Sequence, residues 1–428
     1  MTWSEDAART LAEIFDGTYG APGVVTAVAC IDAAGTAIRA SPGDLPADGR
    51  FEIGSVTKTM TATLLALLQA DGVLELDDEV SRWLSASPDS GITLRQLATH
   101  TSGLPRIAPN HGEADPANPY ARFGPRQAEE GLRQTIPAAG RPHLYSNFGY
   151  QLLGLALERA SGLPYQELIS QRLLEPLAMT CSGSGGSGGG TPLPGHGNSG
   201  EVPHWDQPLP GAGGVEATIG DMARYARACL HPPQDLLGAA ITAAQEPQLP
   251  LGNVSHQALA WAVREDGIRL HAGGTGGFTS AVLIDPARAR AVVMLASCGG
   301  AWPLDRAAFL AVTGGDPREA RPQPPGPEWE DRARETIQML LDGRIMDVHA
   351  RMTAAFQGQV SPGQLDQDWR EQTRDLGPVT EVQVTCQRWP AAYIAADVTI
   401  TFTSGTRAAR IHFDSSLQIA GLEFLPQR

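Results

Sequence analysis

The segment FEIGSVTKTMTATLLALLQADG, residues 51–72, predicts a helix and contains the only lysine of the chain. From Met60 onward its apolar residues cover most of a helical surface, and Gly72 is a residue type that ends helices. The chain has 32 Lys plus Arg residues, and all of them except Lys58 are arginine. Arginine keeps its proton at any working pH, whereas burial can neutralise a lysine. Lys58 is therefore a candidate for proton transfer.

Ser55 precedes Lys58 by three residues, at the start of the predicted helix. Positions i and i+3 share a helix face with Cβ atoms about 5 to 6 Å apart, so the hydroxyl and the amine can touch. A serine at a helix N-terminus also faces free backbone N–H groups, which favour an attacking alkoxide and the oxyanion that follows. The alternative is compositional bias in an Ala-, Gly- and Arg-rich chain, and S-x-x-K alone is a weak motif.

Two further segments carry residues for such a site. In PHLYSNFGYQ, Tyr145 and Asn147 are two residues apart at an extended-to-helix junction and so point the same way. The phenol can relay a proton, and the amide can hold the lysine and a substrate carbonyl; taken alone, the pair is a core tyrosine and a helix cap. In LHAGGTGGF, His271 ends a strand, and Gly273 and Gly274 leave a backbone N–H free to face a ligand.

Together, the S-x-x-K, Y-x-N and H-x-G motifs resemble those of the serine β-lactamase and penicillin-binding-protein-like superfamily, in particular its class C-like branch with carboxypeptidases, aminopeptidases, family VIII esterases and acyltransferases. The likeness covers residues 1–313 and extends over ITLRQLATHTSGLP (92–105), GAGGVEATIGDMARYA (211–226) and HAGGTGGFTS (271–280). The resemblance implies an α/β (α+β) fold in which helices flank an antiparallel sheet, with an additional helical lobe.

The same resemblance implies the roles of the site residues. Ser55 is the acylated nucleophile, Lys58 and Tyr145 form the acid/base pair, and Asn147 orients the substrate. The backbone N–H groups of Ser55 and Gly274 form the oxyanion hole. The resemblance implies no metal and no cofactor.

One departure concerns the third motif. Where β-lactamases and transpeptidases of the superfamily carry the lysine of K-T-G, this chain has His271-Ala272-Gly273. A histidine is mostly uncharged at neutral pH, so substrates defined by a free carboxylate should bind less well. His271 is expected to act in catalysis, and Gly273 and Asn147 to contact substrate. An H-x-G motif at this position resembles that of esterases, D-amino-acid peptidases and stand-alone peptide cyclases in the superfamily.

The leading hypothesis is a serine hydrolase of carboxylic esters or amides, most similar to esterases, that acts through an acyl-serine intermediate. The alternatives are a D-amino-acid peptidase or peptide cyclase/acyltransferase, and then a β-lactamase or DD-carboxypeptidase. A hypothesis of another class is a binding protein that senses its ligand by covalent acylation. The expected partner is a small ester, amide or peptide.

Composition bounds these hypotheses. With 428 residues, of which 42% are hydrophobic, the chain can bury a sizeable core in two or three domains. The formal net charge of -15 disfavours nucleic acid as a partner. Five scattered cysteines without C-x-x-C spacing indicate neither a disulfide framework nor a zinc site. No signal pattern and no apolar run of about 18 residues occurs, so we expect a cytoplasmic protein without membrane contact.

The Pro- and Gly-rich segment TGGDPREARPQPPGPEWE, residues 313–330, predicts an interdomain linker. The expected domains are 1–313 and 329–428, joined by a linker at 314–328. Helical patterns followed by alternating strands predict a small α+β fold for the second domain. It resembles, more weakly, the NTF2-like domains fused to such hydrolases, which also makes a homodimer through this domain an expectation.

The Gly- and Ser-rich segment CSGSGGSGGGTPLPGHG, residues 181–197, predicts a mobile surface loop. It contains a G-x-S-x-G match centred on Ser187. A nucleophile elbow needs a strand before this motif and a helix after it, and a Gly/Ser run matches the pattern trivially. Ser187 is therefore not a candidate nucleophile.

Overall fold

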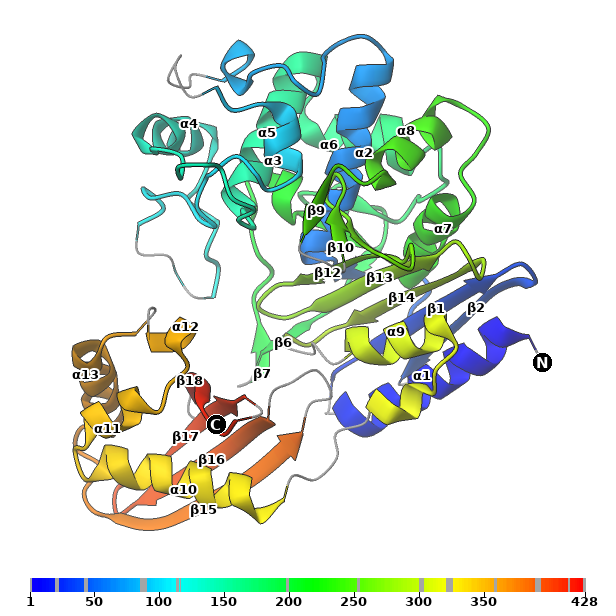
Figure 1. Ribbon diagram of the computed structural model, residues 1–428. Helices are drawn as coiled ribbons and strands as arrows, with labels where there is room; N and C mark the ends of the chain where they lie inside the picture. Colours follow the sequence, from blue (N-terminus) through cyan, green and yellow to red (C-terminus); the bar gives the residue numbers. More distant parts are fainter. Residues whose placement is uncertain are drawn as a thin grey trace. The chain divides into compact units, whose positions relative to one another are not determined.

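The structure, a computed structural model, describes residues 2–19, 23–41, 45–84, 91–112, 115, 117–197, 200–251, 255–299, 304–320, 326–357, 360–388, 394–414 and 416–425. The chain forms two compact units (Figure 1). The first runs to Pro317, and the second, which begins at Arg318, also takes in residues 198–200.

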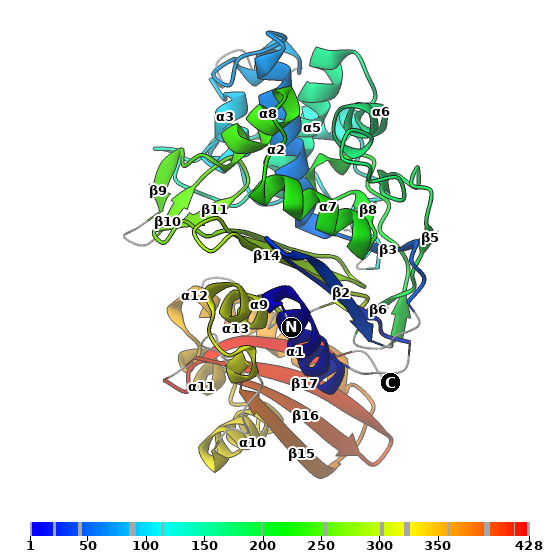
Figure 2. The ribbon, with the colours of Figure 1, turned by 90° about the vertical axis from the view of Figure 1, so that its right-hand side faces the viewer.

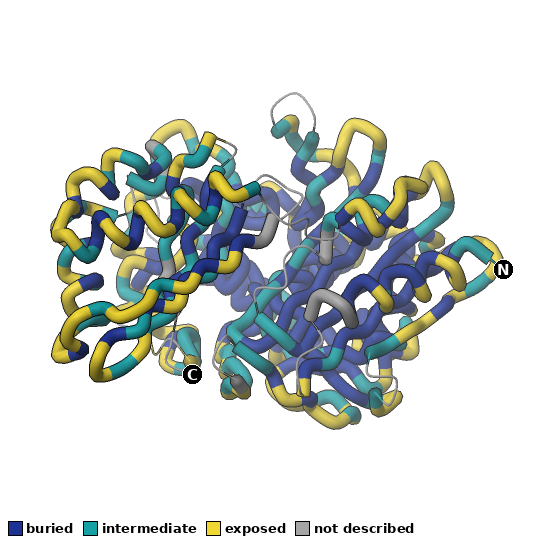
Figure 3. Tube along the Cα trace, turned by 90° about the horizontal axis from the view of Figure 1, so that it is seen from below, coloured by how far each residue is buried: buried dark blue, intermediate teal, exposed yellow. Residues whose placement is uncertain are grey.

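An eight-stranded antiparallel sheet forms the centre of the first unit. Every position of β1 and β13 is buried, which agrees with the continuous apolar runs in their sequences. Figure 3 shows this buried sheet in dark blue. In sheet order, the strands are β2 (Gly35–Ser41), β1 (Thr26–Asp32), β14 (Arg290–Ala296), β13 (Thr279–Asp285), β12 (Arg269–Gly274), β11 (Ala262–Arg264), β10 (Ser255–Gln257) and β9 (Leu249–Leu251).

Helices cover both faces of this sheet (Figure 2). Two terminal helices, α1 (Trp3–Tyr19) and α9 (Leu304–Thr313), pack on one face, and α7 (Ile219–Leu230) packs on the other. The remaining helices build a helical lobe beyond α7. They are α2 (Thr57–Ala70), α3 (Leu94–Ala98), α4 (Pro125–Gln134), α5 (Asn147–Ser161), α6 (Tyr165–Ile169) and α8 (Leu236–Gln245).

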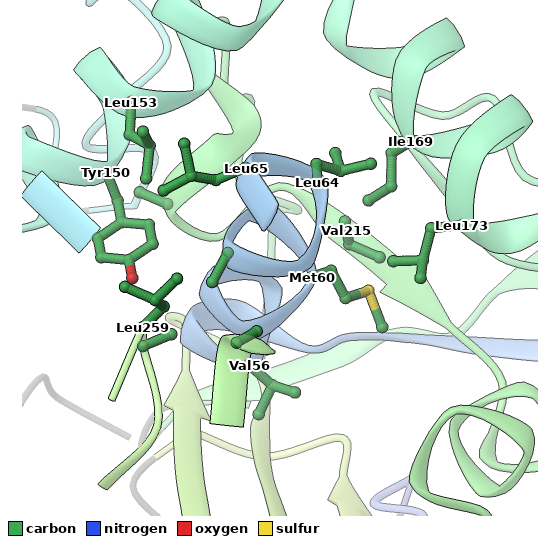
Figure 4. Packing of buried hydrophobic residues seen from close by; sticks show 14 of the residues in the cluster. Val56, Met60, Leu64, Leu65, Tyr150, Leu153, Ile169, Leu173, Val215 and Leu259 are labelled. Atoms are coloured by element: carbon green, nitrogen blue, oxygen red, sulfur yellow. The ribbon is translucent and has the colours of Figure 1, made fainter. Parts of the chain in front are cut away.

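Helix α2 lies at the centre of the lobe and is buried on all sides from Thr57 to Leu68. Its apolar side chains pack against α5 and the segment after α6, as Figure 4 shows for Leu65 beside Tyr150 and Leu153. The backbone enters the left-handed region at Gly72 (φ 72°), where glycine is favoured. The helix predicted from the sequence is confirmed, and its rigid packing fixes the residues at its N-terminus.

The predicted meander of three strands is also confirmed, as β12, β13 and β14. At the end of β12, Gly273 pairs with Ser280 and lies directly against the chain that leads into α2. A Cβ on Gly273 would lie 2.2 Å from the Ile53 carbonyl oxygen and 2.8 Å from the Ser55 nitrogen. Only glycine therefore lets this sheet edge approach the N-terminus of α2.

The prediction of a mobile loop at 181–197 is wrong in part. The segment contributes β4 (Gly183–Ser184) and β5 (Thr191–Pro192) to a four-stranded sheet with β8 (Val215–Ala217) and β3 (Gly49–Glu52), and β6 (Gly195–Gly197) pairs with β7 (Gly200–Val202). A Cβ on Gly183 would lie 2.3 Å from the Gly188 nitrogen, so glycine permits tight packing here. The Ser187 hydroxyl donates to the Ser184 carbonyl oxygen at 2.8 Å.

The second unit is a four-stranded antiparallel sheet with helices, in the order that the sequence predicts. A core that contains Trp369, whose ring lies 5.9 Å from that of Phe424 at a tilt of 42°, fills the space between the sheet and the helices. The helices are α10 (Pro327–Leu341), α11 (Ile345–Ala350), α12 (Ala354–Gln357) and α13 (Pro362–Thr373); the strands are β15 (Val379–Arg388), β16 (Ile394–Phe402), β17 (Gly405–Phe413) and β18 (Ile419–Leu425). Across the described parts of both units, no helix has the length and apolar character needed to cross a bilayer.

Candidate active site

Ser55 lies in a short 3-10 turn, Gly54–Val56, that runs directly into α2. Within residues 51–60, Ser55 alone is not fully buried, so its hydroxyl is open to a substrate. Lys58 follows on the first turn of α2 and is fully buried. Its Nζ lies 2.9 Å from Ser55 Oγ and donates to the Ala212 carbonyl oxygen at 2.6 Å. The sequence spacing thus brings the hydroxyl and the amine into hydrogen-bonding contact.

Burial lowers the pKa of the Lys58 ammonium well below its usual range, and the positive charge of Arg106 lowers it further. A charged group loses its hydration when it is buried, and a nearby like charge adds repulsion, so both effects favour the neutral amine. A neutral amine keeps an N–H for Ala212 and presents its lone pair to the Ser55 hydroxyl. This arrangement suits a general base.

Tyr145 stands in the irregular chain just before α5, with its ring centroid 5.1 Å from Lys58 Nζ. Burial raises the pKa of its phenol, while a side-chain hydrogen bond with Ser55 and the charge of Arg106 oppose the shift in part. The guanidinium of Arg106 lies 5.3 Å from the ring centroid. The phenol therefore stays protonated at neutral pH and can donate a proton.

Asn147 is the first residue of α5, and the Ser146 hydroxyl caps that helix by accepting the Gly149 N–H at 2.8 Å. The Asn147 amide donates to the Tyr120 hydroxyl at 3.1 Å. Within the described residues it makes no hydrogen bond to Lys58, and its Oδ1 atom is buried without a partner. The side chain is thus held by one donor contact and offers a free acceptor.

His271 lies on β12, buried, with its ring 6.5 Å from that of Tyr145. Its Nδ1–H donates to the Ala260 carbonyl oxygen at 2.8 Å, so the neutral ring carries its lone pair on Nε2. Burial lowers the pKa of His271 to about 4. At neutral pH this position therefore carries no positive charge.

The two N–H groups of the predicted oxyanion hole belong to Ser55 and Gly274, which line the same pocket. The chains approach closely because Gly54 has a φ of 48° and no side chain; a Cβ there would lie 2.7 Å from the Gly274 nitrogen. The pocket is lined by Gly54, Ser55, Tyr120, Asn147, Trp205, Gln207, Ala212, Gly213, Gly274 and Thr275.

Several groups that line or hold the candidate site were not identified from the sequence. The Ala212 carbonyl, which holds the lysine, is a backbone group and has no side-chain signal in a sequence. Trp205 and Gln207 come from segments that give no sign of reaching the pocket, and Thr275 directly follows Gly274 in the third motif but was not singled out. Tyr120 belongs to none of the three motifs, yet its hydroxyl accepts a hydrogen bond from the Asn147 amide.

The assembled groups can perform acyl transfer. They comprise a nucleophile and two backbone donors from residues that line one pocket, with a neutral base and a protonated phenol beside the nucleophile. In the part of the chain that the structure describes, no group of three or more His, Cys, Asp or Glu side chains could hold a metal ion.

Comparisons with known proteins show what the chain is similar to. The family model described as Beta-lactamase matches residues 8–313. A penicillin-binding protein of Bacillus subtilis (strain 168) is 33% identical over 148 residues, which cover 32% of this chain and 30% of that protein. The D-alanyl-D-alanine-carboxypeptidase/endopeptidase AmpH of Escherichia coli (strain K12) is 33% identical over 138 residues, covering 31% of this chain and 36% of that protein. The matched segment thus spans about a third of the length of these relatives.

Among solved structures, a class C beta-lactamase superposes with a TM-score of 0.63 at 21% identity. The match covers 72% of this chain and 96% of that one. At this identity the likeness concerns the fold alone, and it confirms the predicted fold class of the first unit.

Proposed function

The chain belongs to the beta-lactamase family, and from this premise we propose that it is a serine hydrolase of carboxylic esters or amides that acts through an acyl-Ser55 intermediate. One observation carries the proposal: the buried Lys58 amine lies 2.9 Å from the Ser55 hydroxyl oxygen. An accessible hydroxyl beside a neutral amine is an activated nucleophile.

Acylation begins when the Ser55 hydroxyl proton passes to the Lys58 lone pair. The Ser55 oxygen attacks the substrate carbonyl carbon, and the electron pair of the C=O bond moves onto its oxygen. The N–H groups of Ser55 and Gly274 stabilise this oxyanion. Because they are fixed in advance by the close packing of β12 against the start of α2, little reorganisation is needed in the transition state.

The tetrahedral intermediate collapses when the carbonyl re-forms and the bond to the leaving group breaks. The Tyr145 ring lies 5.1 Å from Lys58 Nζ, and its protonated phenol donates to the departing oxygen or nitrogen while Lys58 returns a proton to the phenol. A water or an acceptor amine then attacks the acyl-Ser55 carbonyl by the same steps in reverse.

The substrate preference we propose is esterase-like. A fixed cation at position 271 would anchor a substrate carboxylate, but burial keeps His271 neutral. A β-lactamase or DD-carboxypeptidase activity is less well supported for this reason. The absence of an anchoring charge favours neutral acyl donors.

A specific observation favours peptide-like acyl donors as a second candidate, which would suit a D-amino-acid peptidase or peptide cyclase. Three polar atoms of pocket residues are buried and have no hydrogen-bond partner among the described residues: Asn147 Oδ1, Trp205 Nε1 and Thr275 Oγ1. An amide in the acyl group supplies both a donor and an acceptor for such atoms, whereas an alkyl chain leaves them unpaired.

The test is intact-protein mass after brief exposure to p-nitrophenyl pentanoate, with p-nitrophenol release followed in parallel. We expect release together with a transient adduct of one pentanoyl group. A persistent adduct without continued release would instead favour the covalent sensor. The N-acetylglycine p-nitrophenyl ester, corrected for its spontaneous hydrolysis, replaces the alkyl chain by an amide of equal length and separates the two candidates. If neither ester acylates the protein, the proposal is contradicted.

The charge of Arg106 should add to burial in lowering the pH at which the enzyme becomes active. We expect Arg106→Gln to move the acid limb of kcat/KM to higher pH, because the guanidinium holds down the pKa of Lys58 and its removal lets that pKa rise. The pH profile with a neutral ester measures the shift. Arg106→Lys keeps the charge and is the matched control. The acid limb of its pH profile should lie at the same pH as that of the wild type. A limb that moves to lower pH in Arg106→Gln would contradict the assignment of Lys58 as the base.

Three sequence-based expectations remain proposals. They are the NTF2-like identity of the second unit, a homodimer through it, and a cytoplasmic location. Sedimentation of the full chain beside a chain truncated after the first unit tests the dimer, and cell fractionation tests the location.

A further inference from the structure

His100 contacts three consecutive residues around the phenol of the site. Its carbonyl oxygen accepts the Leu144 N–H at 2.8 Å, and its Nδ1 accepts the Ser146 N–H at 3.1 Å. Between these two bonds, its ring lies against that of Tyr145, with centroids 4.4 Å apart and planes tilted by 34°. His100 thus holds the chain on both sides of Tyr145 and covers the ring itself.

The local conformation of His100 is costly in two ways. Its φ is +58°, in the left-handed region that a residue with a Cβ rarely adopts. Its Nε2 atom is buried and, among the described residues, has no hydrogen-bond partner. Such costs persist at positions where the surrounding structure requires a particular side chain, and they concentrate at functional sites.

The ring is held in one protonation state. Because Nδ1 accepts a hydrogen bond, the single ring proton is on Nε2. Burial lowers the pKa of His100 well below its usual range, and the charge of Arg106 adds to the effect. The rings of Tyr150, at 5.1 Å, and His143, at 5.9 Å, enclose it together with Tyr145. His100 is therefore a neutral, fixed ring at working pH.

Tyr145 needs such support because it belongs to no helix or strand. It lies in the irregular chain before α5, where regular backbone hydrogen bonds do not fix the direction of its side chain. Lys58 and Ser55, in contrast, are fixed by the packing of α2. The phenol must reach both of them, so its position depends on what holds residues 144–146.

We propose that His100 is a positioning residue that fixes the Tyr145 phenol against Ser55 and Lys58. The inference rests on the proposed function, because it concerns how the same site keeps its proton donor in place. His100 itself contacts neither the nucleophile nor the substrate. It acts only through Tyr145.

The test variant is His100→Asn. Asparagine tolerates the left-handed backbone, and its Oδ1 can still accept the Ser146 N–H, but the ring that covers Tyr145 is lost. We expect kcat for p-nitrophenyl pentanoate to fall about 10- to 100-fold with little change in KM, because displacement of a reacting group by about 1 Å costs roughly this much. His231→Asn, the same change at an exposed histidine outside the site, is the matched control and should remain close to wild type.

A double-mutant cycle separates positioning from a merely structural role. If His100 acts through Tyr145, adding His100→Asn to Tyr145→Phe should lower kcat no further. Losses that multiply in the double variant would overturn the inference, and so would a His100→Asn variant with the wild-type rate. If His100→Asn does not fold, His100→Phe, which keeps a ring and loses the Nδ1 acceptor, enters the same cycle. The rate at which a fluorophosphonate labels Ser55 provides the readout without turnover. A wild-type protein that neither labels nor turns over would contradict the proposed function itself.

Discussion

We expect Ser55→Ala to abolish ester turnover and the acyl adduct while leaving the fold unchanged. Removal of a nucleophile that works together with its base lowers kcat by about 10⁴-fold or more. The Ser55 side chain is only partly buried and contributes a hydroxyl to the Lys58 hydrogen bond, so its loss leaves no cavity in the core. Intact-protein mass and p-nitrophenol release report the two losses directly.

Ser187→Ala is the matched control for this experiment. Ser187 sits in the chain's G-x-S-x-G match, but its hydroxyl is held by the Ser184 carbonyl oxygen in a turn of the Gly-rich segment. We expect this variant to keep the wild-type rate and adduct. Both variants should melt at the wild-type temperature. A Ser55→Ala protein that still forms an adduct at another residue would contradict the assignment of Ser55 as the nucleophile.

Much of the fold could be predicted because burial leaves strong local patterns. The continuous apolar residues of α2 and β1 are found where the periodicity placed them. The small sheet of β3, β4, β5 and β8 could not be predicted in the same way. Its strands are only two to four residues long, which is too short for a side-chain period, and only tertiary packing decides that Gly183 pairs with Glu216.

The predicted membership of the serine β-lactamase and penicillin-binding-protein-like superfamily is confirmed by the family match and the structural likeness. Likewise, the helices followed by an antiparallel sheet after residue 326 appear as the sequence indicated. The NTF2-like identity of that unit stays a prediction, because a helical pattern followed by strands is common to many small α+β folds.

The candidate site was predictable only where chemistry requires a particular side chain. Ser55, Lys58 and Tyr145 come together as the motifs indicated, since each carries a group that can be recognised in a sequence. The groups that hold them could not be recognised. The Ala212 carbonyl is common to every residue type, and the contacts of His100 with Leu144 and Ser146 depend on how two distant segments pack.

Lys58→Arg should be nearly as damaging as the loss of the nucleophile, although it keeps the positive charge. An arginine cannot give up its proton at any working pH, so it offers no lone pair to the Ser55 hydroxyl. Lys58 is also fully buried between Ser55 Oγ and the Ala212 carbonyl oxygen, where a wider guanidinium does not fit without displacing α2 or its neighbours. We expect kcat to fall by about 10⁴-fold, the upper end of the range that general base catalysis contributes.

A second variant separates two roles for Lys58, a general base and a fixed positive charge. Lys58→Met removes the amine but has a slim, apolar side chain that suits the buried position, so it should fold at least as stably as the wild type. If Lys58 serves as the base, both variants are inactive because neither can accept the serine proton. If the site needed only a positive charge, arginine would rescue activity and methionine would not. Since burial already disfavours the charged form of Lys58, we expect the first result, and a Lys58→Arg protein with the wild-type rate would rule it out.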